Sequence, residues 1–187
     1  MNLDRFSDLK GQHSFLSASN YHWINDDEEK FRDRYLKFKA IQKGTEDHAF
    51  AATCIERNQK LPRSSQTLNM YVNDAIGFRM KPEVVLGYSK KAFGTADSIA
   101  FNEKRGELRI HDLKTGYSKA SMKQLDVYEA YFCLMNGIKP SDINTELRIY
   151  QSNDIFVEVP DPEEIMAIIN KIIAFNKIMD EIDEKEE

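Results

Sequence analysis

The periodicity of hydrophobic positions changes near residue 80. Before it, apolar side chains recur every three or four residues, as Phe31, Tyr35 and Phe38 do, which is typical of helices. The pattern predicts helices over residues 21–24, 31–41, 45–58 and 66–79. Thr45 follows Gly44 and is expected to cap the third of them.

Beyond residue 80, short apolar and β-branched runs separated by turn residues indicate strands. They predict strands that begin at residue 84 and then cover 93–101, 107–113, 146–150 and 155–159. Two more helices are predicted over 119–136, ended by Gly137, and over 163–182. This order of elements predicts an α/β fold, more closely an α+β mixed sheet flanked by helices.

The chain shows no internal repeat or flexible linker, and we expect one domain over residues 1–187. Its parts would be a helical segment at about 14–80, a core at about 83–159 and a helix at about 161–183. An isoleucine stripe on that last helix favours packing on the core, and a subunit contact in a homo-oligomer stays open.

Composition excludes several classes of protein. No run of about 18 apolar residues suggests a transmembrane helix, and the charged N-terminus is unlike a signal peptide, so the cytoplasm is expected. Cys54 and Cys133 lie far apart and outside any C-x-x-C pair, which argues against a zinc ribbon or a four-cysteine cluster. Each is expected to be a small buried hydrophobe on a helix.

Charge is distributed unevenly along a chain whose net charge is −5. Residues 79–123 hold ten Lys/Arg and five Asp/Glu, whereas residues 154–187 hold eleven acids and three lysines. A basic segment around a site suits a phosphate-backbone ligand, although on charge alone an uneven solvated surface is the favoured explanation. The DNA-contacting candidates are Lys90, Lys91, Lys119 and Lys123.

A predicted hairpin carries the chemistry. If its turn is centred between Lys104 and Arg105, three cross-strand pairs share one face of the sheet. They are Phe101 with Leu108, Ile99 with Ile110, and Asp97 with Asp112, and Lys114 joins the same face. A slip of one residue would move the whole set to the other face.

Two opposed carboxylates are destabilising without compensation. A hard divalent cation such as Mg²⁺ would compensate Asp97 and Asp112 and prefers such oxygen ligands. The alternative is that Lys114 neutralises the aspartates in a structural ion pair.

Four motifs in order resemble the RecB-type branch of the PD-(D/E)XK nuclease superfamily, over about two-thirds of the chain. They are Lys43–Ala49 (KGTEDHA), Phe93–Asp97 (FGTAD), Ile110–Gly116 (IHDLKTG) and Gln124–Tyr128 (QLDVY). The resemblance implies a restriction-endonuclease-like core and a metal-dependent DNA nuclease. We expect an exonuclease acting in phage or bacterial DNA recombination, replication or repair, with a recombination partner protein.

The resemblance also implies roles for single residues. Asp97, Asp112 and His48 would ligate Mg²⁺ or Mn²⁺, with the backbone carbonyl of Leu113 completing the shell. Lys114 would be the catalytic lysine, with Gln124 and Tyr128 beside it and the substrate backbone. Glu83 begins the preceding strand, where related sequences often carry a glutamate. Many members bind an iron–sulfur cluster through four cysteines, and with two we expect a form without the cluster.

Each role has an alternative. His48 could be an ordinary helix histidine, Gln124 a capping partner of Ser121, and Tyr128 part of an aromatic core. His111 alternates with the core-facing residues of its strand and receives no catalytic role. For the whole chain, the alternative is a nucleic-acid-binding module of the same fold without catalysis.

Overall fold

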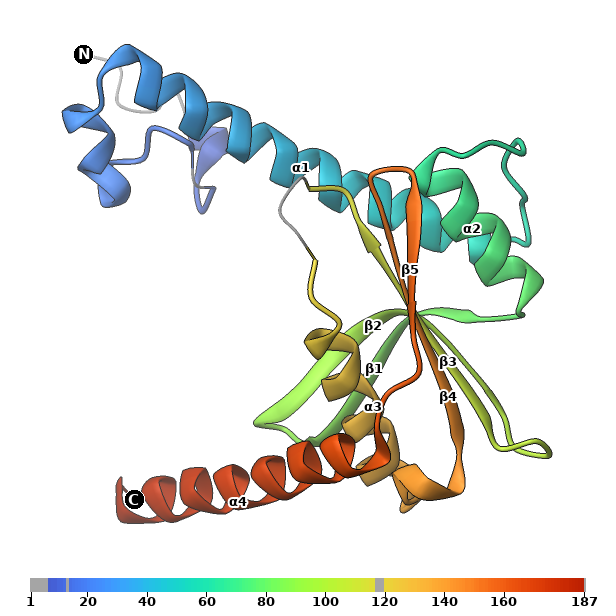
Figure 1. Cartoon of the computed structure of the whole chain (residues 1–187). Coiled ribbons are helices and arrows are strands. Elements are labelled where there is room, and N and C mark those ends of the chain that lie inside the picture. Colours follow the sequence, from blue (N-terminus) through green and yellow to red (C-terminus); the bar gives the residue numbers. More distant parts are fainter. Residues whose placement is uncertain (1–6, 13, 117–119, 187) are drawn as a thin grey trace. The chain divides into compact units, whose positions relative to one another are not determined.

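The computed structural model describes residues 7–12, 14–116 and 120–186, and Figure 1 traces them from blue to red. The chain divides into two compact units, Met1–Lys43 and Gly44–Glu187. All candidate site residues belong to the second unit. The expectation of a single nuclease domain over the whole chain stays a prediction.

The first unit is built around a small aromatic cluster. It contains the short 3-10 helices Ser7–Leu9 and Ala18–Asn25 and the beginning of α1 (Glu28–Glu56). The ring centroid of Phe15 lies 5.7 Å from that of Phe31, 5.2 Å from that of Tyr35 and 5.0 Å from that of Phe38. The apolar stripe predicted for residues 31–41 is therefore the packing surface for Phe15.

Helix α1 corrects one prediction. Two helices were expected, the second capped by Thr45, but α1 runs without interruption through Gly44 and Thr45. A single glycine costs only about 1 kcal/mol in a helix interior, and no proline interrupts this stretch. Gly44 is buried, and a Cβ there would lie 2.7 Å from Thr115 Oγ1, so glycine permits close approach to the end of β3.

The sheet has five strands in the order β1-β2-β3-β4-β5. Their bounds are β1 (Lys81–Ser89), β2 (Ala92–Asn102), β3 (Glu107–Lys114), β4 (Asn144–Gln151) and β5 (Asp154–Glu158). Neighbours are antiparallel except β3 and β4, which are parallel and joined through α3 (Lys123–Asn136). The predicted mixed sheet flanked by helices is confirmed.

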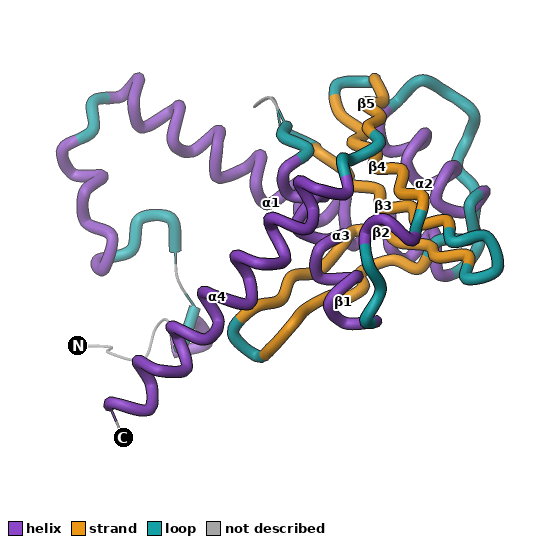
Figure 2. Tube along the Cα trace, turned by 60° about the horizontal axis from the view of Figure 1, so that its bottom comes forward, coloured by secondary structure: helices purple, strands orange, loops and turns teal. Residues whose placement is uncertain are grey.

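Helices cover both faces of this sheet (Figures 1 and 2). On one face, α3 and α4 (Pro162–Glu186) bury Leu125, Phe132 and Ile165 against Ile99 and Ile110. On the other face, α2 (Thr67–Gly77) and the end of α1 form a second core. Its buried members include Ala51, Tyr71, Val72, Leu113 and Tyr150. The sheet is thus the middle of three layers.

Helices α3 and α4 differ slightly from their predicted bounds. Helix α3 begins at Lys123 rather than near residue 119, and Gly137 ends it with φ +65°, as predicted. Helix α4 continues to Glu186, and its isoleucine stripe is divided: Ile165 is buried, whereas Ile178 is 50% exposed. None of the described helices has the length and apolar character needed to cross a membrane.

The two cysteines behave as expected from their isolation in the sequence. Both are free and buried. Cys54 lies in the core beneath α1 and α2, and Cys133 lies in the core beneath α3 and α4. They therefore fill core space on opposite faces of the sheet.

Candidate functional site

The β2–β3 hairpin has the predicted register. Ile99 pairs with Ile110 and Phe101 with Leu108. The backbone ladder ends at Ser98 and His111, one step before the predicted pair of aspartates. There the Leu113 N–H donates a hydrogen bond to Asp97 Oδ2 at 2.8 Å. Leu113 thus orients the Asp97 carboxylate through its N–H, and the role expected for its carbonyl stays a prediction.

The neighbouring strand, β1, is irregular at Glu83. The β1–β2 ladder pairs Pro82 with Ser98 and Val84 with Ala96, and it skips the Glu83–Asp97 position between them. Glu83 has φ +51°, in the left-handed region, which costs a non-glycine residue roughly 1–2 kcal/mol. Backbone strain of this kind persists only where surrounding structure holds it and is concentrated at functional sites.

The alternation of side chains along β2 slips at the same point. Ala96 and Ile99 both pack in the core beneath α3 and α4, although they are three residues apart. A regular strand would place them on opposite faces. Asp97 therefore lies outside the regular pairing of β2 with both β1 and β3.

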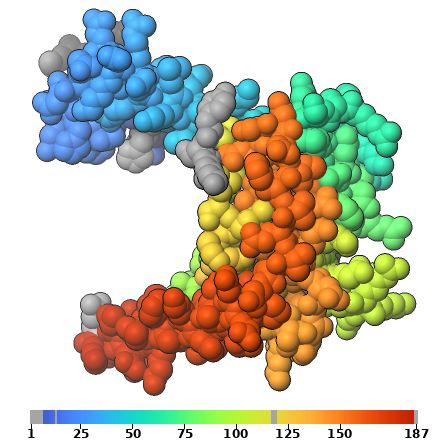
Figure 3. Space-filling model, viewed as in Figure 1, coloured from blue at the N-terminus to red at the C-terminus, as the bar shows by residue number. Residues whose placement is uncertain are grey.

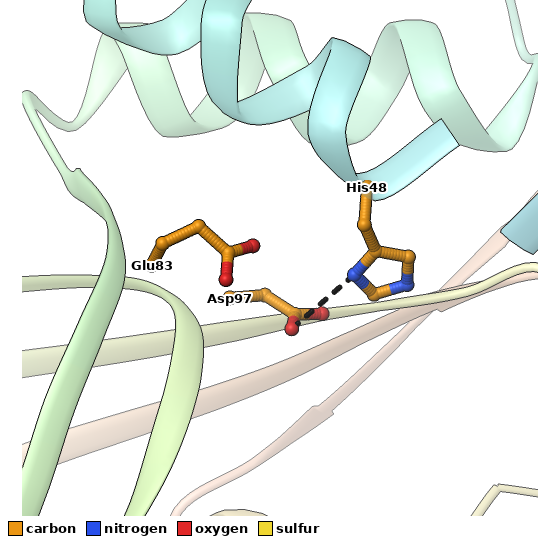
Figure 4. Close-up of side chains that lie close together, drawn as sticks. All are labelled: His48, Glu83 and Asp97. Atoms are coloured by element: carbon orange, nitrogen blue, oxygen red, sulfur yellow. Dashed lines mark ion pairs between the residues drawn. The ribbon is translucent and has the colours of Figure 1, made fainter. Parts of the chain in front are cut away.

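Three side chains from three elements meet at this irregularity (Figure 4). They are His48 on α1, Glu83 on β1 and Asp97 on β2, and one ligand atom of each lies within 4.8 Å of the others. His48 Nδ1 is 3.4 Å from Asp97 Oδ1. An imidazole nitrogen and two carboxylates form a donor set for a divalent cation. Glu83, the least supported residue in the sequence, is central to this geometry.

Negative charge is crowded around the triad. Burial raises the pKa of Asp112 to about 6, Asp97 adds to the increase, and Lys114 opposes it. Burial and then Asp97 also raise the pKa of Glu83. The Asp97 side chain raises the pKa of His48 against the effect of its partial burial. Three carboxylates therefore share this region with one lysine and one histidine, and a bound cation would relieve their repulsion.

Lys114 connects Asp112 to α3. Its Nζ lies 3.0 Å from Asp112 Oδ2 and donates a hydrogen bond to Gln124 Oε1 at 2.9 Å. Gln124 Nε2 in turn donates to Tyr128 Oη at 3.0 Å. The structure therefore brings together the lysine, glutamine and tyrosine that the motifs singled out. The Lys114–Asp112 contact is also the ion pair that the structural alternative requires.

The capping alternative for Gln124 is not realised. The N-cap of α3 is Met122, without a side-chain cap, and the Ser121 hydroxyl accepts a hydrogen bond from the Lys123 N–H at 3.3 Å. Tyr128 packs against the core, as the aromatic-core alternative expects, and its hydroxyl also accepts a hydrogen bond from Gln124; its role at the substrate backbone stays a prediction. A Cβ at Gly94 would lie 2.9 Å from Tyr128 Cε1, so the glycine leaves room for this ring.

Gln151, which no motif indicated, binds Gly116 and Ala120, two residues that lie between Lys114 and α3 in the sequence. Its Nε2 donates to the Gly116 carbonyl at 2.7 Å, and its Oε1 accepts from the Ala120 N–H at 3.2 Å. It pairs with Lys114 across the parallel β3–β4 ladder. Only that pairing brings this distant residue to the site, so local sequence patterns could not reveal it.

The lysines proposed to contact DNA have varied surroundings. Lys91 Nζ forms ion pairs with Asp180 at 2.7 Å and Asp183 at 2.5 Å. Lys123 Nζ contacts Glu164 at 2.8 Å and Asp126 at 3.1 Å. Lys90 is exposed in the turn between β1 and β2, and Lys119 lies outside the described residues.

His111 lies where its strand position predicted. It is fully buried on the face opposite Ile110, with its Nδ1 3.3 Å from Tyr150 Oη. Its ring packs edge-on against Phe78 at 5.6 Å between centroids. These contacts give His111 a structural place in the core away from the triad.

Comparisons of the chain with protein-family models, with curated proteins and with solved structures found no match.

Proposed function

We propose that the chain is a divalent-metal-dependent nuclease that hydrolyses phosphodiester bonds of DNA. The observation that carries the proposal is the convergence of His48, Glu83 and Asp97 beside the Lys114–Gln124–Tyr128 chain. These residues come from α1, β1, β2, β3 and α3, so the tertiary fold assembles them. A restriction-endonuclease-like core and an exonuclease mode are part of the proposal and rest on the sequence resemblance.

The donor chemistry fits Mg²⁺ or Mn²⁺. His48, Glu83 and Asp97 would hold the ion, and Asp112 would contribute a further carboxylate next to Asp97. Carboxylate oxygens suit hard divalent cations, and one imidazole is compatible with Mn²⁺. When bound, such an ion polarises a phosphate oxygen and lowers the pKa of an attacking water.

Lys114 would act on the reacting phosphate. Its ammonium group is fixed by Asp112 and by Gln124, and its side chain remains 30% exposed. A cation fixed in this way can orient water or offset charge that develops on the phosphate in the transition state. Gln124 and Tyr128 would position the ammonium group, because they extend its hydrogen-bond chain along α3.

The test is cleavage of end-labelled linear DNA and of circular DNA with Mg²⁺, with Mn²⁺ or with EDTA. We expect the native protein to degrade linear DNA only when metal is present, and Lys114→Ala to lose about 100-fold or more of the rate. Sparing of the circular DNA would identify an exonuclease. The matched control is Lys139→Ala, which removes an exposed lysine from the connection between α3 and β4.

Two outcomes would contradict the proposal. Full cleavage by Lys114→Ala would remove the lysine from the chemistry. A folded native protein that binds DNA and metal but cleaves under none of these conditions would favour the non-catalytic binding module instead. Circular dichroism of each variant separates lost activity from lost fold.

A further inference from the structure

A hollow of about 640 Å³ opens between the turn before β1 and the β2–β3 hairpin. In Figure 3 the green segment ahead of β1 and the yellow-green hairpin project at one edge of the sheet unit. Four cationic side chains line the hollow, together with two aromatic rings. They are Arg79, Lys81, Lys104 and Arg109, with Phe78 and Phe101.

Three of these cations lack a partner. Arg79, Lys81 and Lys104 are exposed, and within the part of the chain that the structure describes none of them forms an ion pair or side-chain hydrogen bond. Lys91 and Lys123, by contrast, are held by acids. Among the described residues of the basic segment 79–123, most of the cations without a partner therefore lie here, and Lys90 lies elsewhere.

Arg109 is fixed at the wall of the hollow. Its guanidinium carbon lies 4.7 Å from the centroid of the Phe78 ring, and its Nε donates to Glu146 at 3.3 Å. Glu103 and Glu107 also line the hollow, and Glu107 lies 3.7 Å from Arg109. Arg109 thus offsets the Glu107 charge, and the three unpaired cations exceed the one remaining carboxylate.

The hollow and the candidate metal site share strands β1 and β2. Lys81 and Val84, which line it, flank Glu83 on β1, and Ile99, also in its wall, follows Asp97 by two residues on β2. None of the three triad residues lines the hollow, so a polyanion lying in it would reach the triad by extending along β1 and β2. A phosphate backbone meets this arrangement, because regularly spaced negative charges would contact successive cations.

We propose that this hollow, called the cationic groove from here on, binds the phosphate backbone of the nucleic acid beside the cleavage site. The inference rests on the proposed function, and it places the substrate contacts on Arg79, Lys81 and Lys104 rather than on the ion-paired Lys91 and Lys123. Contacts of this kind fix register and orientation and carry no base specificity.

The test is fluorescence anisotropy with a labelled DNA duplex in EDTA, where metal-dependent cleavage cannot occur, over a series of NaCl concentrations. The groove variant combines Arg79→Gln, Lys81→Gln and Lys104→Gln. Removal of three phosphate contacts should flatten the slope of log affinity against log salt by roughly 2 to 3 and weaken binding by about tenfold or more.

The control variant combines Lys139→Gln, Lys171→Gln and Lys185→Gln. These lysines are exposed, and none of them lines the hollow. Their substitution removes the same total charge as the groove variant does. It should keep the native slope and affinity. Calorimetric titration with Mn²⁺ should give the same metal affinity for the groove variant as for the native protein, because the triad is intact.

The outcomes separate this inference from the proposed function. If the native protein cleaves DNA but the groove and control variants bind alike, the groove inference alone fails. If a poly-glutamate peptide of equal charge binds as tightly as the duplex, the groove takes acidic peptides and the inference is overturned. If the native protein neither binds nor cleaves DNA, the proposed function fails with it.

Discussion

Two buried ionisable side chains, Glu129 and His111, have opposite effects on stability as pH changes. Burial raises the pKa of Glu129 from 4.5 to about 7, although the Thr145 hydroxyl donates to it at 2.8 Å. Burial lowers the pKa of His111 from 6.5 to about 3, with Arg148 and Arg109 adding to the decrease. Each group therefore favours its neutral form in the folded protein.

The pH dependence from Glu129 has a definite sign. Between pH 4.5 and 7 the folded protein retains a proton on Glu129 that the unfolded chain has released. Stability therefore falls as pH rises through this window. His111 acts in the opposite sense: its contribution is present above pH 6.5 and is lost as pH falls toward 3.

We predict that Glu129→Gln is more stable than the native protein at pH 8 and shows little of this advantage at pH 4.5. The difference in unfolding free energy should grow with pH by up to roughly 3 kcal/mol, because the amide does not ionise. Urea unfolding at both pH values measures it. His111 is common to both proteins and cancels, so an advantage that is constant with pH would contradict the prediction.

At the scale of elements, the packing of α3 against the β1–β2 hairpin holds Lys114 in place. Gly94 on β2 leaves room for the Tyr128 ring, and Tyr128 accepts from Gln124, which binds Lys114. The left-handed backbone of β1 at Glu83 brings the Glu83 carboxylate close to His48 and Asp97. The site therefore depends on how α3 and the strands β1, β2 and β3 approach one another.

Gly94→Ala tests this dependence. The new methyl group would lie 2.9 Å from Tyr128 Cε1 and displace the ring. We expect a loss of about 1–3 kcal/mol of stability and a fall in cleavage rate of roughly tenfold or more, from misplacement of Gln124 and Lys114. Urea unfolding and cleavage of linear DNA measure the two effects.

Gly77→Ala is the matched control, since a Cβ at Gly77 meets no atom within 4 Å. It should leave the cleavage rate unchanged. Equal rates for the two alanine variants would mean that Tyr128 does not position Lys114.

At the scale of the molecule, both hydrophobic cores lie within the second unit. Every buried residue of the two cores comes from Ala51 onward, whereas the first unit ends at Lys43. The candidate metal triad, Lys114 and the cationic groove lie in the second unit as well. The first unit contributes its own aromatic cluster around Phe15.

We predict that a fragment of residues 44–187 folds cooperatively and binds Mn²⁺ as the full chain does. Its urea midpoint should be close to that of the full chain, because no residue of either core is removed. Circular dichroism during urea unfolding and calorimetry measure these properties. A fragment without a cooperative transition would show that the first unit stabilises the second.

The sequence by itself determined the approximate positions of the strands and of most helices, and the register of the β2–β3 hairpin. These features depend on neighbouring residues, since alternation and turn position set which side chains face each other. That register predicted Asp97 opposite Asp112, although the observed backbone ladder ends one step earlier, at Ser98 and His111. The continuity of α1 could not be predicted from the sequence. The buried, closely packed Gly44 has the same sequence pattern as a glycine at a helix boundary.

Only the tertiary structure decided which distant residues meet. Glu83 lies close to Asp97 because its backbone adopts the left-handed region inside β1. Gln151 contacts Gly116 because β3 and β4 pair in parallel. It also decided which cations are paired with acids and which line the groove. These relations depend on the approach of elements far apart in the chain, which local periodicity does not encode.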